Sequence, residues 1–166
     1  MKVIVKSGDV LDEKVDVLIC TANPLLRMSG GVNGMLLQRD GRTVQEELNR
    51  YLGDRKLNHV PRGTIVPTGP GPLAVSHILH AVGVDVFYAT TIPIVEDLIR
   101  LALGECLRLK ARTVAMPALA TGYGPLTIAE FGAALGQAVT APFEGIDELR
   151  VVLRTEEEAE EVRRAL

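Results

Sequence analysis

Two segments of the chain are dense in glycine and directly follow apolar runs. The first, TANPLLRMSGGVNG at 21–34, places three glycines and two asparagines behind the run VDVLIC, and the second is PALATGYGPLT at 117–127. Glycine frees the backbone at an entropic cost and lets a ligand approach the main chain closely. Each segment lies at or near a predicted helix N-terminus, where unpaired N–H groups bind phosphate or diphosphate. These residue types therefore indicate main-chain recognition of a phosphorylated ligand.

Either segment alone is more simply a tight connection between a strand and a helix. Both follow predicted strands of an α/β sheet, however, and ligands of such sheets bind beyond the carboxyl ends of the strands. Two glycine-rich loops at one sheet edge favour a divided phosphate site over two unrelated turns. Asp9, in SGDV behind the first apolar run, is most simply a turn residue, but its carboxylate could accept a hydrogen bond from an exocyclic amino group.

The spacing of residues does not support other kinds of site. GPGPLA at 69–74 has the glycine spacing of a dinucleotide fingerprint, but two prolines lead it into a strand-like run rather than a helix, so we expect a turn. The sequence contains neither a Walker A motif nor a G-x-S-x-G elbow. His59, His77 and His80 have no metal-ligand spacing with cysteine or carboxylate. We therefore expect no metal and no cofactor.

The composition is that of a globular protein, with 166 residues, a hydrophobic share of 47% and a net charge of −3. That charge leaves no basic field for non-specific nucleic-acid binding, and three Tyr, three Phe and no Trp argue against a base-stacking surface. Cys20 and Cys106 lie in apolar runs without a CxxC partner, which indicates buried free thiols in a reducing compartment. The sequence shows no signal-peptide core and no membrane-spanning run, so we expect a cytoplasmic protein.

Apolar runs rich in β-branched residues alternate with segments of helical spacing. The predicted strands are 3–5, 15–20, 63–68, 77–84, 113–119 and 149–153. Period-3.6 spacing predicts one long helix with a buried stripe made of Val95, Leu98, Ile99, Ala102, Leu103, Cys106 and Leu107. The order β, β, α, α, β, β, α, β, α, β, α, in which two paired strands lead into alternation, predicts one α/β domain over residues 1–166 with a mixed sheet between helix layers.

Local signals set the expected helix boundaries. Thr-x-x-Glu capping boxes predict helix starts at Thr43, Thr127 and Thr155. A short helical segment, MLLQRDG, follows the first glycine-rich segment and is predicted to end at Gly41. The acidic residues after Thr155 are most simply the solvated face of a terminal helix, with arginines at its far end to match the helix dipole.

Taken in order, these pieces resemble the macro domain, the ADP-ribose-binding module. The matching pieces are GDV after the first strand, VDVLICTANPLL for the family's strand and turn, SGGV for its glycine loop, HAVG for its His-x-Val-Gly strand, and PALATGYG for its second loop. The resemblance covers essentially the whole chain. It implies a three-layer α/β/α sandwich with a six-stranded mixed sheet, and a cleft whose partner is ADP-ribose or an ADP-ribosylated molecule.

The resemblance also implies a set of ligand-binding residues. Asp9 and the Val10 backbone would meet the adenine, the two loops would hold the diphosphate through main-chain N–H groups, and Asn23 and Tyr123 would meet the distal ribose. Amide donors need no basic protein, which agrees with the net charge. The predicted binding residues are Asp9, Val10, Asn23, Ser29, Gly30, Gly31, Val32, Asn33, Ala120, Thr121, Gly122, Tyr123, Gly124 and Arg154.

Three positions depart from the family pattern. Asn33 stands where hydrolases of the MacroD type carry an aspartate, and an amide cannot serve as a general base. The loop ATGYG is one residue shorter than usual, and Arg154 falls where the family often stacks an aromatic on adenine; a guanidinium can also stack there.

The expected function is ADP-ribose binding, with three outcomes open. As an enzyme, the chain would hydrolyse ADP-ribosyl esters or O-acetyl-ADP-ribose at the distal ribose, with a water held between Asn23, Asn33 and a ligand phosphate that polarises it. The alternatives are a non-catalytic reader or metabolite sensor with the same site, and a structural α/β module without a ligand. A dinucleotide oxidoreductase ranks last, because its fingerprint is misplaced.

Overall fold

The computed structural model describes residues 1–40 and 42–166, and within them six strands form one mixed sheet in the order β1-β6-β5-β2-β4-β3. The strands are β1 (Lys2–Ser7), β2 (Val17–Ala22), β3 (Ile65–Thr68), β4 (His77–Val82), β5 (Thr113–Met116) and β6 (Glu148–Leu153). All neighbouring strands are parallel except β3 and β4, which are antiparallel. The carboxyl ends of five strands therefore meet at one edge of the sheet.

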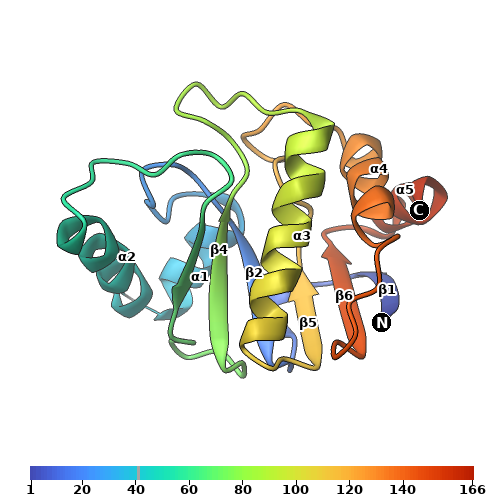
Figure 1. Cartoon of the computed structure of the whole chain (residues 1–166), viewed down its shortest axis with the longest axis horizontal. Helices are drawn as coiled ribbons and strands as arrows, with labels where there is room; N and C mark the ends of the chain where they lie inside the picture. Colours follow the sequence, from blue (N-terminus) through green and yellow to red (C-terminus); the bar gives the residue numbers. More distant parts are fainter. Residues whose placement is uncertain (41) are drawn as a thin grey trace.

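Helices cover both faces of this sheet, so the predicted three-layer α/β/α architecture is confirmed (Figure 1). They are α1 (Gly31–Asp40), α2 (Thr43–Asp54), α3 (Ile92–Arg108), α4 (Ile128–Ala138) and α5 (Glu156–Ala165), with a 3₁₀ turn η1 (Val10–Asp12) after β1. Helices α1 and α2 pack on one face, and α3, α4 and α5 pack on the other. The predicted order of strands and helices agrees with this succession.

The core consists of two apolar layers, one on each side of the sheet. In β2, Val17 and Ile19 face the α3–α5 layer, whereas Leu18 and Cys20 face the α1–α2 layer. All four side chains are buried because successive residues of a strand point to opposite faces. Continuous apolar runs are what such doubly covered strands require.

The long helix α3 buries the stripe that its spacing predicts. Six of the seven predicted residues, Val95, Leu98, Ile99, Ala102, Leu103 and Cys106, are buried against the sheet and α4, and Leu107 is half-buried at its edge. Both cysteines are buried and free, as expected. No described helix is long and apolar enough to cross a membrane.

The expected pairing of the first two strands is wrong. β1 pairs with β6 at the edge of the sheet, whereas β2 lies at the centre between β5 and β4. The side chains account for this. β2 is apolar on both faces and needs a neighbour on each side, while β1 carries Lys2 and Lys6, which suit an edge strand.

Of the three predicted capping boxes, one forms completely. The Thr127 hydroxyl accepts from Glu130 N at 3.2 Å, and the Glu130 carboxylate accepts from Thr127 N at 2.8 Å. Thr155 caps α5 through Glu158 N, but the Glu158 carboxylate bonds Arg154 N instead of completing the box.

The box predicted at Thr43 is wrong. Arg42 is the N-cap of α2 and makes no side-chain cap bond, so Thr43 is already the first helical residue. Residues 69–74 form a turn, closed by a bond from Leu73 N to Pro70 O, as expected. The helix end predicted at Gly41 lies outside the described residues.

Candidate functional site

A cavity of about 590 Å³ opens at the carboxyl edge of the sheet. Segments that follow β1, β2, β4 and β5 line it together with the end of β6, so all five parallel strands contribute. The structure brings every predicted ligand-binding residue to this one cavity: Asp9, Val10, Asn23, Ser29, Gly30, Gly31, Val32, Asn33, Ala120, Thr121, Gly122, Tyr123, Gly124 and Arg154. Their roles toward a ligand stay predictions.

In the first glycine-rich segment the helix begins at an earlier residue than the composition predicts. Helix α1 begins at Gly31 rather than near residue 35, and Gly30 and Gly31 have φ angles of 65° and 51° that favour glycine. The bond from Gly34 N to Gly30 O is 2.8 Å long. The N–H groups of Gly31, Val32 and Asn33 therefore precede the first intrahelical bond and lie at the cavity.

In the second glycine-rich segment the main-chain N–H donors belong to the loop and not to a helix N-terminus. Leu126 N donates to Ala120 O at 3.2 Å and closes the loop, while Ala120 takes the left-handed conformation at φ 59°. A Cβ at Gly124 would lie 2.2 Å from Ala120 O, so only glycine fits there. The capping box already satisfies N–H groups at the start of α4. The donors that this segment can offer to the cavity are therefore the main-chain N–H groups of the loop 120–124.

Tyr123 joins the two segments across the cavity mouth. Its hydroxyl lies so close to Gly30 that a Cβ there would come within 2.1 Å of it. The glycine therefore makes room for an aromatic ring as well as for a turn. The Tyr123 ring also contacts Tyr88, with ring centroids 6.4 Å apart and planes tilted by 58°.

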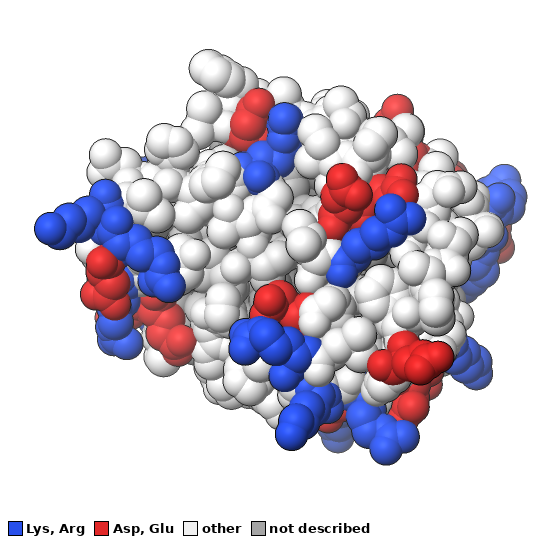
Figure 2. Space-filling view, in the orientation of Figure 1, with Lys and Arg blue, Asp and Glu red and all other residues white. Residues whose placement is uncertain are grey.

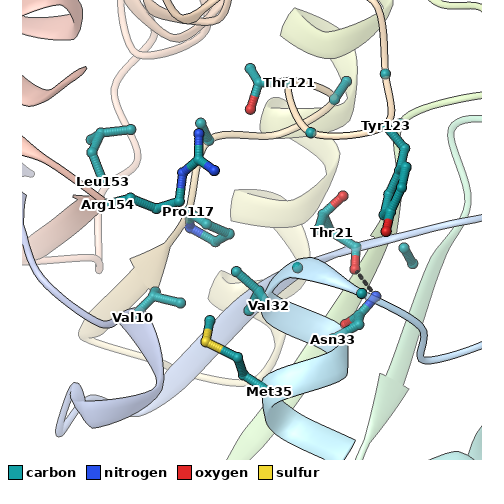
Figure 3. Close-up of a pocket in the computed structure, with 18 of the residues that line it drawn as sticks. Val10, Thr21, Val32, Asn33, Met35, Pro117, Thr121, Tyr123, Leu153 and Arg154 are labelled. Atoms are coloured by element: carbon teal, nitrogen blue, oxygen red, sulfur yellow. Dashed lines mark hydrogen bonds between the residues drawn. The ribbon is translucent and has the colours of Figure 1, made fainter.

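The two asparagines of the first segment do different things. Asn33 is 7% exposed; its Nδ2 donates to Thr21 O at 2.7 Å, and its Oδ1 has no hydrogen-bond partner among the described residues (Figure 3). Asn23 instead closes its own loop, donating to Arg27 O at 2.7 Å and accepting from Arg27 N at 3.2 Å. Asn33 thus lines the cavity with a buried, unpartnered acceptor, whereas the Asn23 amide is already engaged.

Asp9 lies at the opposite end of the cavity in a network that includes a residue the sequence did not indicate. Its Oδ1 accepts from Leu11 N at 2.9 Å and its Oδ2 accepts from Arg39 at 2.7 Å, while Arg39 also binds Asp12. The Asp12 bond raises the pKa of the Arg39 guanidinium. Asp9 is therefore the turn residue expected of it and, in addition, a fixed carboxylate at the cavity wall.

Arg154 is held along the start of α5. It donates to Glu158 at 2.6 Å, and its own side chain is 83% exposed. Burial opposes ionisation of Glu158, but the bonds from Arg154 and Thr155 outweigh it and lower the pKa of that carboxyl. The guanidinium is thus held beside the cavity by Glu158, in the first turn of α5.

Several lining residues were not predicted from the sequence. They are Met35, Leu153 and Pro117, which add apolar surface, together with Thr21 and Tyr88. Thr21 and Pro117 begin the two glycine-rich segments but were given no role, whereas Met35, Leu153 and Tyr88 belong to no motif that the sequence singled out. Knowledge of strand order would have been needed to bring them together.

The cavity offers amide donors and acceptors rather than a nucleophile. Its carboxylates belong to Asp9 and Glu158, and each is paired with an arginine. Burial raises the pKa of the Cys20 thiol to about 12, so it stays protonated. No three His, Cys, Asp or Glu of the described residues come together to hold a metal ion. Figure 2, in the orientation of Figure 1, shows acidic and basic side chains interspersed on the viewed face of the molecule, without a field of one sign.

The fold and the cavity together define an α/β/α protein with a loop-built cleft at the carboxyl edge of a mixed sheet. The Macro domain family model matches residues 19–131, and the chain belongs to the macro domain family.

Sequence relatives include a protein of Pyrobaculum aerophilum, 30% identical over 93% of this chain and 81% of that protein. The "Macro domain-containing protein in sno 5'region" of Streptomyces nogalater is 31% identical over 88% and 81%. A Thermotoga maritima protein is 33% identical over 73% of this chain, but the match spans only 20% of that longer protein.

Similar solved structures share the fold. A mutant of the Oceanobacillus iheyensis macrodomain with ADPR has a TM-score of 0.82 at 24% identity, covering 96% of this chain and 89% of that one. The Trypanosoma brucei macrodomain in complex with ADP-ribose has a TM-score of 0.79 at 20% identity, covering 98% and 68%.

Proposed function

We propose that this chain binds ADP-ribose in the cavity at the carboxyl edge of its sheet. The observation that carries the proposal is the pair of main-chain segments, 31–33 and 120–124, which line one cavity together. Amides at a helix N-terminus and in a glycine-rich loop bind a diphosphate well. Two solved structures of the same fold are described with ADPR or ADP-ribose, which supports the choice of ligand.

The two ends of the cavity suit the two ends of this ligand. At one end the fixed Asp9 carboxylate is a pure acceptor for an amino group, and Val10 and Met35 supply apolar contact for a base. At the other end the unpartnered Asn33 Oδ1 accepts a hydroxyl of the distal ribose, beside Tyr123. Filling that acceptor removes the cost of a buried polar atom left without a partner.

The experiment compares a glycine of the second segment with a glycine outside the cavity. Gly124→Ala forces a Cβ to within 2.2 Å of Ala120 O and must open the loop, so we expect ADP-ribose affinity, measured by calorimetry, to fall at least about tenfold. Gly104→Ala in α3 is the control, because Gly104 does not line the cavity and no atom lies within 4 Å of its added Cβ. Equal affinities in both variants and the wild type would contradict the main-chain cradle.

A second function, hydrolysis at the distal ribose, is favoured by one observation. The free Oδ1 of Asn33 can orient a water as readily as a ribose hydroxyl, and a ligand phosphate could polarise that water. Substrate-assisted cleavage of an ADP-ribosyl ester would then be slowed by Asn33→Ala and, to a smaller extent, by Asn23→Ala. Wild-type turnover in both variants rules this route out, and tight binding without any product assigns the chain to the readers.

A further inference from the structure

Aromatic side chains are few in this chain, and the exposed ones are unevenly placed. Among the residues that the structure describes, the exposed aromatics are Phe87, Tyr88 and Tyr123. Tyr88 and Tyr123 both line the cavity, at 46% and 72% exposure, and their rings are in contact. The small aromatic share of the sequence argued against a stacking surface, but two of its six aromatics stand together at one cavity mouth.

The loop that carries Tyr88 holds it in a strained conformation. Tyr88 has a φ of 61°, a region that bulky residues rarely adopt. Asp85 Oδ1 accepts from both Phe87 N and Ala89 N at 2.9 Å, and Asp85 N donates to Ala89 O at 3.1 Å. Arg62 braces this loop, with 3.5 Å to the Asp85 carboxylate and 2.9 Å to Ala89 O. Burial does not explain the conformation, since the ring stays half in solvent. Strain of this kind points to a functional role for the side chain.

We propose that Tyr88, together with Tyr123, forms a stacking subsite for a planar heteroaromatic ring attached to the distal ribose. The proposal rests on the proposed function, which sets the distal ribose at the Asn33–Tyr123 end of the cavity. The ligand class is then ADP-ribose that carries a base at its distal sugar. Two exposed aromatic rings in contact line the cavity there, and the group that such rings suit best is flat and aromatic.

The tilt of the two tyrosine rings fits this role. Their planes differ by 58° at a centroid distance of 6.4 Å, so the rings do not cover one another's faces. At least one face is left open for a third ring, which can lie parallel to one tyrosine and edge-on to the other. Both arrangements are favourable for aromatic pairs.

The test uses two ligands that differ only by that ring. P1,P2-di(adenosine-5′) diphosphate is ADP-ribose with adenine at the distal ribose, and its affinity is compared with that of ADP-ribose by calorimetry. Stacking of one base on an aromatic side chain predicts tighter binding of the dinucleotide by about fivefold to 150-fold. Tyr88→Ala should bring the ratio of the two affinities to about one, Tyr88→Leu should do nearly the same, and Tyr88→Phe should preserve it.

Phe87→Ala is the matched control for the same loop. Phe87 is 87% exposed and does not line the cavity, so the ratio should stay at its wild-type value. A further arm uses a 5′-adenylylated oligoribonucleotide, which presents the same base joined to a chain. If the oligoribonucleotide and the dinucleotide both bind tightly, the stacking subsite accepts the ends of nucleic acids. If only the dinucleotide binds, the subsite accepts free dinucleotides.

The outcomes separate this inference from the proposed function. If ADP-ribose binds and the dinucleotide binds no tighter, or if Tyr88→Ala leaves the ratio unchanged, the stacking subsite is wrong while ADP-ribose binding stands. If neither ligand binds, the proposed function fails first. If Tyr88→Ala weakens only an ADP-ribosylated peptide, the rim serves a polypeptide and the stacking subsite is overturned.

Discussion

Asn33 shows why a residue type alone did not define its role. The sequence marked it as an amide where related hydrolases carry a carboxylate, but only the fold shows that its Nδ2 is committed to Thr21 O and its Oδ1 left free. Thr21 lies at the end of β2 and Asn33 in the first turn of α1, so the bond ties the strand to the helix that follows it. The residue is therefore both a structural link and the acceptor that the cavity presents.

Asn33→Asp should be destabilising for this reason. A carboxylate oxygen would replace the donor 2.7 Å from Thr21 O, and we expect the free energy of unfolding at pH 7 to fall by about 1–3 kcal/mol. The buried, unpaired carboxylate prefers to be protonated in the folded state, so part of the loss should return as the pH is lowered. Urea denaturation at two pH values measures this.

Asn23→Asp is the control, because Asn23 makes the same kind of bond to Arg27 O at an exposed site where water can compensate. A loss in Asn23→Asp as large as that in Asn33→Asp would show that the position at 33 is not special.

His80 makes stability depend on pH. Its imidazole is buried in β4 with Nε2 3.0 Å from the Thr68 hydroxyl, and desolvation lowers its pKa from 6.5 to about 4. Between those two values the unfolded chain binds a proton that the folded chain does not. The free energy of unfolding should therefore fall as the pH drops from 6.5 to 4, by up to about 3 kcal/mol from this group alone.

Denaturation curves at pH 7, 5.5 and 4 test this dependence. His80→Gln should flatten the pH slope. An unchanged slope in His80→Gln would assign the acid sensitivity to other groups.

At the scale of elements, the periodicity of apolar residues predicted the helices and strands better than capping and glycine residues predicted where helices begin. The stripe of α3 and the doubly apolar β2 follow from periodicity, because burial imposes that periodicity directly. The start of α1 does not follow from periodicity, because Gly30, Gly31 and Gly34 have low helix propensity and gave no reason to extend the predicted helix toward them. There, burial of Asn33 and Leu36 against the sheet outweighs local preference.

The capping boxes supply a prediction with its own control. Thr127→Ala removes the hydroxyl that accepts from Glu130 N in a formed box and should lower the free energy of unfolding by about 1 kcal/mol. Thr43→Ala alters the same sequence motif where no cap bond is made, and should cost much less. Urea denaturation of both variants measures the difference; equal losses would mean that the motif, rather than the bond, matters.

At the scale of the whole molecule, the order of strands was the part that sequence reasoning missed. Strands that are consecutive in the chain often pair, yet β6 and β5 separate β1 from β2. The apolar faces of β2 suit the centre of the sheet, and the lysines of β1 suit its edge. That order brings Asp9, Asn33, Tyr123 and Arg154 to one cavity. Family resemblance predicted this set, whereas Met35, Leu153 and Tyr88 became visible only through the topology.

The measurement that tests the central claim most directly is a calorimetric titration of the wild-type chain with ADP-ribose, beside ribose 5-phosphate as a ligand that lacks the adenine and half of the diphosphate. Two main-chain segments in one cavity predict a single saturable site for ADP-ribose, with ribose 5-phosphate at least about tenfold weaker. Saturation with ADP-ribose should also raise the melting temperature, because the ligand binds only the folded chain. The absence of saturable binding up to millimolar ADP-ribose would contradict the account.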